Sequence, residues 1–512
     1  MFLNRITFYI FVLIFATLQV FPEASENRLL INFDDAEAIG VTNNVILATL
    51  KDRKDVFRML VKEKWRNYLP KVALSYFGLK NANVNQPDSQ YNDIRLQLNQ
   101  LLYDGGENSL EIESAKLQEL LNQEDWKIVK DKTVLEVRRT ALKYLSFELK
   151  HYLNLKYNEK MQFNIKAALD EKEKGYITDL QYLELQTKVR EFDLSLVKSK
   201  SQMNIAHLDL IKTLNLPLET QVRFKHSIIE DFEILPPNSE LLSEQYLFQK
   251  PEIKKSRLAI ENLRTRAEIA ENYWKPKVIF GSYYGQNVNA PLPVTNEVYG
   301  FNISLQAQLG SSTTQSTANY GVQSDGTGIQ RIPGYGPQFV GRGENAFNSS
   351  TVNLFDDLSY SRKIYEGKIA LSDAIRNKQL LEVTVRADIH KGYEKLDEAW
   401  EIIRVMNSKL ALNKEIVKNV KNKFSKGFSK KLDVLNAEYD LLKSYEDLLV
   451  ALMGYIDLSF EMAFILGTPY EELKLVKIRP GGGNSFIREN FDQDILFKSE
   501  KINSKEMQTN PL

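Results

Sequence analysis

Residues 175–186 read GYITDLQYLELQ, and 252 positions later residues 427–438 read GFSKKLDVLNAE. The same offset of 252 relates Pro217 to Pro469, and no gap is needed between these points. This period is too long for a solenoid repeat, in which each unit has about 20 to 50 residues. The sequence therefore predicts two structurally equivalent halves.

Two terminal segments of different composition flank these halves. Arg5 precedes an apolar run from Ile6 to Val20, which is short for a membrane span and typical of a secretory signal. We therefore expect export, with an uncleaved N-terminal anchor as the alternative. The predicted organisation is a signal peptide at residues 1–24, a first repeat at 25–217, a connector at 218–250, a second repeat at 251–469 and a polar C-terminal tail at 470–512.

Long helices are predicted on both sides of Gly175 and of Gly427, the glycines that begin the two matching stretches. Residues 88–216 and 338–468 contain no proline, the residue that most strongly breaks a helix. The 68 residues between Gly106 and Gly175 would form a helix of roughly 100 Å at about 1.5 Å per residue. Each half should therefore contain one long helix that reverses into a second helix at its glycine.

The last long helix carries an apolar stripe in steps of three and four, which is the pattern of coiled-coil packing. Its members are Leu432, Leu435, Tyr439, Leu442, Glu446, Leu449, Met453, Ile456, Phe460 and Ala463. A second partial stripe through Tyr445, Leu448 and Leu452 widens the apolar surface. This helix is therefore expected to contact neighbours on two sides, as in a tube of helices.

Four shorter segments alternate with a period of two and are predicted to be β-strands. They are Lys71–Gly78, Asp93–Leu101, Lys277–Gly285 and Tyr299–Leu309. In the second and fourth segments, apolar side chains alternate with polar ones that include Arg95, Gln97, Asn99, Ser304, Gln306 and Gln308. Such strands fit a membrane barrel with lipid outside and these six side chains lining a water-filled lumen. A solvent-faced sheet packed on the helices is the alternative.

Four strands are too few to close a barrel, but three chains would supply about twelve, which lies within the known range. No uninterrupted apolar run of about 20 residues, the length of a membrane-spanning helix, follows the signal. An exported chain of this kind can cross a bilayer only as a closed barrel, because open strand edges leave unpaired backbone groups in hydrocarbon. The strand count therefore predicts a homotrimer.

One segment breaks the symmetry of the halves. The strands correspond at an offset of 209 and the helices at 252, so 43 extra residues at 310–352 separate the fourth strand from the next helix. Their Gly, Ser, Thr and Gln content predicts a loop. Two positions stay open, at the inner end of the fourth strand or, if the true strand lies at 348–355, on the extracellular side.

Composition excludes several classes of function. Acidic and basic residues balance at 67 each, so no basic excess indicates a nucleic-acid partner. The chain has no cysteine, and its four histidines stand singly, which argues against disulfides and metal cages. We find no catalytic motif or phosphate-binding loop, so we expect neither an enzyme nor a cofactor.

Over essentially its whole mature length, the chain resembles the TolC-type outer-membrane efflux proteins. The resemblance rests on the ordered, duplicated motifs NYLPKV at 67–72, LLYDGG at 101–106, PEI at 251–253, NYWKPKV at 272–278 and GFSKKLDVLNAE at 427–438. It implies an α+β, mostly α fold, with a long coiled-coil α-helical barrel and a transmembrane β-barrel closed by a trimer.

The resemblance also implies a location and a function. The location is the outer membrane of a Gram-negative bacterium, with the helices extending into the periplasm. The function is a passive conduit of a tripartite efflux or type I secretion system, opened by a periplasmic adaptor (membrane fusion) protein and an inner-membrane transporter. The resemblance does not identify the exported substrate, because the inner-membrane transporter selects it.

The resemblance assigns roles around the two glycines as well. It implies adaptor docking at the helix turns, through Gly175, Tyr176, Lys426, Gly427, Ser429 and Lys430. It implies a periplasmic gate at Asp433, with Asn436 standing where the family has a second acidic ring, so the charge of the gate would be halved. The alternative for Asp433 is a helix-start aspartate stabilised by the helix dipole.

A different class of function is also compatible with long helices in an exported chain. This is a periplasmic coiled-coil adaptor or scaffold without a pore. The duplication and the alternating strands argue against it, because an adaptor hairpin needs one helical excursion and not two.

Overall fold

The computed structural model describes residues 28–491 apart from residues 83, 85–88, 291–293, 323–328, 332–336 and 340–344. The predicted signal peptide and the last part of the predicted tail lie outside the described residues. The chain divides into two compact units, the first formed by Met1–Leu47, Val129–Tyr246 and Ala387–Leu512 and the second by Ala48–Ile128 and Leu247–Arg386. Helices α4 (Glu107–Glu173) and α9 (Tyr360–Ser425) run through both units.

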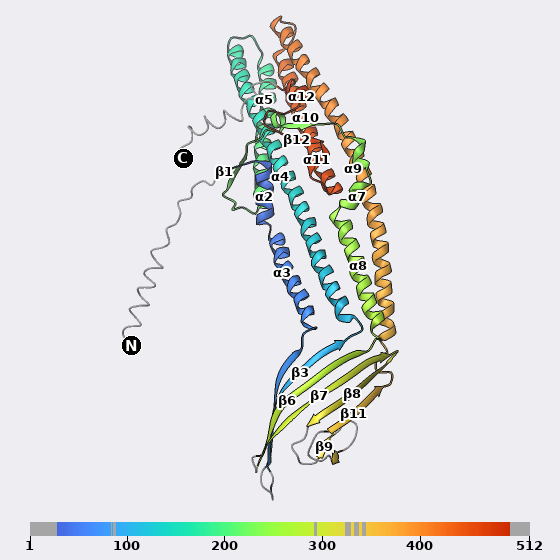
Figure 1. Cartoon of the computed structure of the whole chain (residues 1–512). Helices are drawn as coiled ribbons and strands as arrows, with labels where there is room; N and C mark the ends of the chain where they lie inside the picture. Colours follow the sequence, from blue (N-terminus) through green and yellow to red (C-terminus); the bar gives the residue numbers. More distant parts are fainter. Residues whose placement is uncertain are drawn as a thin grey trace, which may run out of the picture. The chain divides into compact units, whose positions relative to one another are not determined.

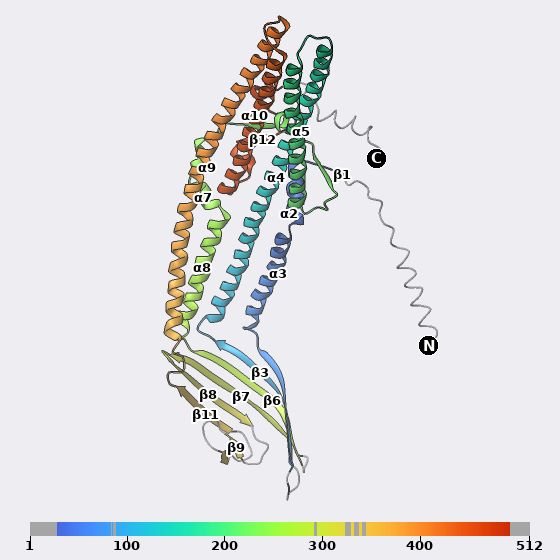
Figure 2. The same cartoon turned by 180° about the vertical axis from the view of Figure 1, so that it is seen from behind.

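The second unit contains an antiparallel sheet of six strands in the order β11-β8-β7-β6-β3-β2 (Figure 1). The strands are β2 (Lys71–Asn81), β3 (Ser89–Tyr103), β6 (Lys277–Ala290), β7 (Val294–Leu309), β8 (Ser312–Val322) and β11 (Asn345–Asn353), and the short strands β9 (Ile329–Arg331) and β10 (Pro337–Phe339) pair separately. Helix α8 (Pro251–Asn272) leads into β6 and α3 (Val45–Arg66) into β2, as the reverse view shows (Figure 2).

All four predicted strands are present, but the predicted count of four strands per chain is wrong. The segment expected to be a polar loop instead contains β8 and most of β11, which overlaps the alternative strand position at 348–355. β8 pairs with β7 from Leu309–Ser312 to Tyr299–Val322. A tight turn with Gly310 at φ 64° joins the two strands, a conformation that glycine adopts without steric cost. Ser, Thr and Gln resemble a loop in isolation, yet they form a strand here because β7 supplies the backbone partners.

In the first unit, α4 reverses into α5 (Asp179–Leu214) and α9 reverses into α10 (Lys431–Leu466). Both returning helices have 36 residues, and their bounds differ by the offset of 252 seen in the sequence. Each ends at a left-handed residue, Asn215 at φ 51° and Gly467 at φ 67°, which terminates the helix in the usual way.

Helix α10 buries nearly half of its residues, and its predicted apolar stripes are confirmed as core. Leu435, Leu442, Leu449, Ile456 and Phe460 are all buried, as are the three residues of the second stripe. Among the described residues, α10 is the one helix whose length and apolar composition would allow it to cross a membrane. The charges that interrupt the apolar run and the packing of half of that window inside the protein favour a core helix.

The connector and the start of the predicted tail pack together in the same unit. Strand β1 (Arg28–Ile31) pairs parallel with β4 (Gln221–Phe224), and β12 (Val476–Ile478) pairs antiparallel with β5 (Phe232–Ile234). The short helices are α2 (Phe33–Asn43), α6 (Ile228–Asp231), η1 (Ser239–Leu242), α7 (Gln245–Gln249), which lies at the boundary of the units, α11 (Tyr470–Leu473) and α12 (Ser485–Arg488).

The described part of the predicted polar tail, residues 470–491, is packed against the connector. Leu475, Ile487 and Phe491 are buried, and the Asp231 carboxylate accepts a 2.8 Å hydrogen bond from the Gly481 N–H. The polar composition of this stretch hid these few apolar anchors, each of which removes enough surface from water to favour a folded segment.

Candidate functional site: two helix turns and a two-faced sheet

The α4–α5 turn (residues 174–178) and the α9–α10 turn (residues 426–430) have the same backbone. Gly175 has φ 76° and Gly427 has φ 75°. The N–H after each glycine reaches back five residues, from Tyr176 to the Glu171 carbonyl at 2.8 Å and from Phe428 to the Lys423 carbonyl at 2.9 Å. This is a helix end that needs a left-handed residue, so local backbone geometry explains both glycines.

Each turn presents one aromatic ring to solvent, directly after the glycine. Tyr176 is 77% exposed and Phe428 is 82% exposed. Tyr176 is among the predicted docking residues and Phe428 is not, although the offset of 252 relates the two positions. Exposed aromatic rings at matched positions are features that a binding surface uses more often than a solvated turn does.

Asp433 completes the start of α10. Its Oδ2 atom accepts hydrogen bonds from the Lys430 backbone N–H at 2.8 Å and from the Ser429 hydroxyl at 2.9 Å. These bonds to the charged form hold the pKa of the Asp433 carboxyl below its usual value. At the matched position, the Gln181 side chain likewise accepts the Thr178 N–H at 2.9 Å, so both side chains perform the same capping task.

The predicted site residues near Asp433 differ in exposure and in ion pairing. Asp433 and Asn436 are both exposed on α10, whereas Leu435 between them is buried. Lys426 and Lys430 are exposed as expected, but Lys431 pairs with Glu171 of α4 at 2.9 Å. The α9–α10 turn is therefore tied to the end of α4.

Sequence reasoning missed a buried acid one turn and a half further along α10. The Glu438 side chain is 1% exposed, and its Oε1 atom lies 2.6 Å from Lys160 Nζ of α4 and 2.7 Å from Lys421 Nζ of α9. A carboxylate out of water needs such compensation. Glu438 therefore joins three helices, and no pattern in the sequence indicates this because its two partners are distant in the chain.

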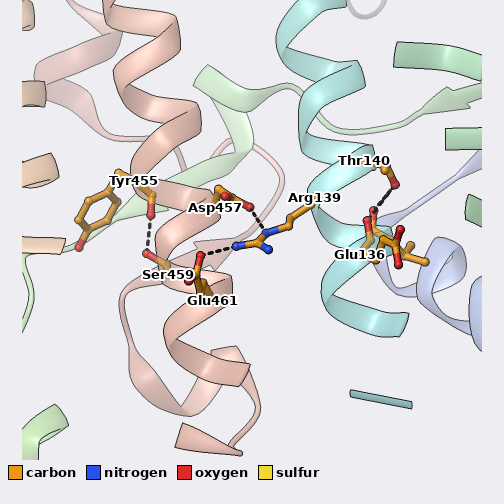
Figure 3. Close-up of polar contacts among 8 residues, drawn as sticks. Glu136, Arg139, Thr140, Tyr455, Asp457, Ser459 and Glu461 are labelled. Atoms are coloured by element: carbon orange, nitrogen blue, oxygen red, sulfur yellow. Dashed lines mark hydrogen bonds and ion pairs between the residues drawn. The ribbon is translucent and has the colours of Figure 1, made fainter. Parts of the chain in front are cut away.

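A second charged junction lies at the other end of α10. Figure 3 shows Arg139 of α4 between Asp457 and Glu461 of α10, with Nε 2.8 Å from Asp457 Oδ1. Burial is the main cause that raises the pKa of Asp457, because the Arg139 guanidinium only partly offsets the loss of water and the second carboxylate opposes ionisation. Arg139 thus forms ion pairs with two acidic side chains and links α4 to α10.

The sheet of the second unit has two faces of opposite character. The strand register places the six side chains predicted to line a lumen on one face. On that face, Arg95 pairs with Asp93 and lies over the Tyr283 ring. The opposite face carries exposed apolar side chains, of which Leu74 is 74%, Leu96 51% and Leu305 41% exposed. A large exposed apolar surface of this kind marks a contact with lipid or with another protein.

In the described part of the chain, no group of three or more histidine or acidic side chains has the geometry of a metal site. The charged clusters at Glu438 and Arg139 are instead pairs of opposite sign, which leave no ligand set free for a cation. Their geometry holds helices together.

Comparison with solved structures identifies the fold, whereas no protein-family model and no curated protein matches the sequence. The Campylobacter jejuni CmeC outer membrane channel matches with a TM-score of 0.65 at 13% identity, covering 90% of each chain. The Vibrio cholerae outer membrane protein VceC matches with 0.64 at 10% identity, covering 86% of this chain and 96% of that chain. The open state of the Neisseria gonorrhoeae MtrE outer membrane channel gives 0.63 at 13%, covering 85% and 89%. The chain therefore has the fold of these outer membrane channels.

Proposed function

We propose that this protein is a passive channel of the outer membrane of a Gram-negative bacterium, assembled from three copies and serving an export system. The two-faced sheet is the observation that carries the proposal. Its exposed apolar face fits lipid, its polar face fits a water-filled lumen, and a single chain leaves the sheet open. Open strand edges are not tolerated in hydrocarbon, so further copies have to close the barrel.

The helices of the first unit support assembly independently. Apolar side chains remain exposed on α5 and α9, several of them three or four residues apart. They are Leu180, Leu183, Leu194, Val197, Ile205 and Leu208 on α5, and Ile402, Val405, Leu412 and Ile416 on α9. Exposed apolar residues on these long helices favour a contact with another copy.

The two turns are proposed as the docking surface for a periplasmic adaptor, which would couple the channel to an inner-membrane transporter. Tyr176 and Phe428 are the aromatic anchors of this surface, and Lys426 and Lys430 supply exposed charge at its rim. Aromatic anchors surrounded by polar residues are the common arrangement of an interface centre. The glycines keep the turns tight and leave the space beside them open, since a Cβ at either would meet nothing within 4 Å.

Asp433 and Asn436 are proposed as the narrowest polar ring of the inner entrance. Three carboxylates brought toward a threefold axis would attract cations and repel anions. This role is compatible with helix capping, because one carboxylate oxygen carries both capping bonds and the side chain is exposed.

The assembly test uses the purified full-length protein. We expect a trimer on a denaturing gel that dissociates on heating, and discrete single-channel currents when it is added to planar bilayers. A monodisperse monomer that produces no conductance would overturn the proposal and favour the rival function, a periplasmic adaptor without a pore.

A further inference from the structure

Strand β7 is paired along most of both edges. One edge pairs with β6 from Lys277–Gln306 to Asn289–Val294, and the other edge pairs with the whole of β8 from Tyr299 to Leu309. In the described part of the chain, the sheet ends at β2 on one side and β11 on the other. Any closure of the barrel by a second copy must therefore begin at β11 or displace β8.

The hairpin preserves the direction needed for closure. β7 runs toward the Gly310 turn, β8 runs away from it, and β11 returns to lead into α9, so β11 is parallel to β7. β2 starts directly after α3 and is antiparallel to β3. The hairpin adds two strands, so the last strand of the sheet keeps the direction of β7. β11 would therefore lie antiparallel to β2 of a second copy, as adjacent strands of membrane barrels do.

Both faces of the sheet continue onto β8, the first strand of the hairpin. On the apolar face, the aromatic rings of Phe280, Phe301 and Tyr320 form a row across β6, β7 and β8, with centroids 6.3 and 5.3 Å apart. On the polar face, Thr317 of β8 donates a hydrogen bond to Ser304 of β7 at 3.2 Å. The environment that acts on β7 therefore acts on β8 as well.

The apolar face of the hairpin carries hydroxyl groups, which need partners if they lie in a membrane. Ser316 of β8 and Ser350 of β11 lie opposite each other and hydrogen-bond at 2.9 Å. This hydrogen bond gives these two hydroxyl groups a partner within the hairpin.

We infer that each copy contributes six strands to the wall and that β11 pairs with β2 of a second copy of this chain, so that three copies close a barrel of eighteen strands. The inference rests on the proposed trimeric channel. Because barrel diameter grows roughly linearly with strand number, such a wall is about 1.5 times as wide as one of twelve strands. Barrels of 16 to 18 strands leave an open aqueous channel, so the outer end of this conduit would admit large cargo.

Disulfide crosslinking tests the inference directly, because the chain has no cysteine of its own. One set of variants joins the polar faces of β2 and β11 by combining Ala73→Cys or Ser75→Cys with Ser349→Cys or Thr351→Cys. The matched set keeps the β2 cysteine and combines it with Ser304→Cys or Gln306→Cys on β7. A third variant, Ser304→Cys with Thr317→Cys, reports the β7–β8 pairing within one chain.

After oxidation of the trimer in membranes, we expect covalent oligomers from at least one β2–β11 pair, only monomers from every β2–β7 pair, and an internal bond between residues 304 and 317. Oligomers from a β2–β7 pair without the internal bond would overturn the inference and leave a barrel of twelve strands with the hairpin outside its wall. Conductance without any interchain bond would overturn it too. Absence of both trimer and conductance in the cysteine-free parent would instead reject the proposed channel itself.

Discussion

At the scale of single residues, some charged side chains of α10 form ion pairs with neighbouring helices, whereas others remain exposed to solvent. Glu438 is enclosed by two lysines and Lys431 is paired with Glu171, so both are committed to packing. Asp433 uses one oxygen for capping but stays exposed. The proposed entrance role of Asp433 is therefore compatible with helix capping, and the two roles predict different responses to substitution.

Replacing Asp433 by Asn keeps an acceptor for the Lys430 N–H and removes the charge. We expect lower cation preference and weaker block by divalent cations in single-channel recordings, with an effect that shrinks near 1 M salt, where the screening length falls to roughly 3 Å. Asp440→Asn is the matched control, since Asp440 is an exposed acid on the same helix. Equal selectivity of parent and Asp433→Asn at low salt would leave Asp433 with capping alone.

The capping role has its own pH signature. The pKa of Asp433 is lowered in the folded protein, so its stabilising contribution is present above the usual value of 3.8 and is lost as pH falls through the lowered folded value. Asp433→Ala removes the acceptor and the first-turn charge and should cost about 0.3–1 kcal/mol above pH 4. Thermal melts of the two proteins at pH 7 and at lower pH should therefore converge as the pH falls below 4.

At the scale of elements, the same turn is built twice from different residues. The left-handed glycine, the aromatic ring after it and the capping side chain at the third helical position recur at matched places, although Gln181 in one turn corresponds to Asp433 in the other. Backbone hydrogen bonds determine the turn, so only the glycine is fixed by geometry. The variable residues are free to serve binding.

Substituting the turn glycine separates turn geometry from assembly. In Gly427→Val the added Cβ meets no atom within 4 Å, but the β-branched residue must adopt a positive φ, which costs about 1–3 kcal/mol. We expect impaired export with trimer formation and conductance retained. Phe428→Ala, which keeps the backbone and removes the ring, should impair export to a similar degree, and loss of the trimer in either variant would show that the turn is required for folding and not for docking.

At the scale of the whole molecule, the chain is incomplete by itself. The sheet has two open edges and an exposed apolar face, and helices α5 and α9 expose apolar side chains. Each of these surfaces is costly in water and favourable in an assembly within a membrane. Assembly and insertion should therefore depend on which face of a strand carries a charge.

Two neighbouring positions on β7 allow a charge on the apolar face to be compared with the same charge on the polar face. Leu305→Arg puts a charge on the apolar face and should cost about 2–4 kcal/mol if that face lies near the middle of the bilayer, which would reduce the amount of protein recovered in the outer membrane. Gln306→Arg puts the same charge on the polar face and should insert normally while shifting ion preference toward anions. Equal recovery of both variants in membrane fractions would contradict the orientation of the sheet.

Periodicity in the sequence alone determined most of the architecture. The 252-residue offset located both glycine turns, steps of three and four identified the buried face of α10, and alternation located β2, β3, β6 and β7 together with the face that carries Arg95 and Gln306. These features depend on residues close in the chain, whose spacing records which side of an element is buried.

Only the tertiary structure decided the hairpin β8–β11, the folding of residues 470–491, and the pairing of Glu438 with Lys160 and Lys421. A Ser- and Thr-rich segment forms a strand when a neighbouring edge supplies its hydrogen bonds, and a buried acid is stable when distant lysines reach it. Both conditions are set by partners remote in sequence. The number of strands per chain, which fixes the width of the proposed pore, therefore could not be read from composition.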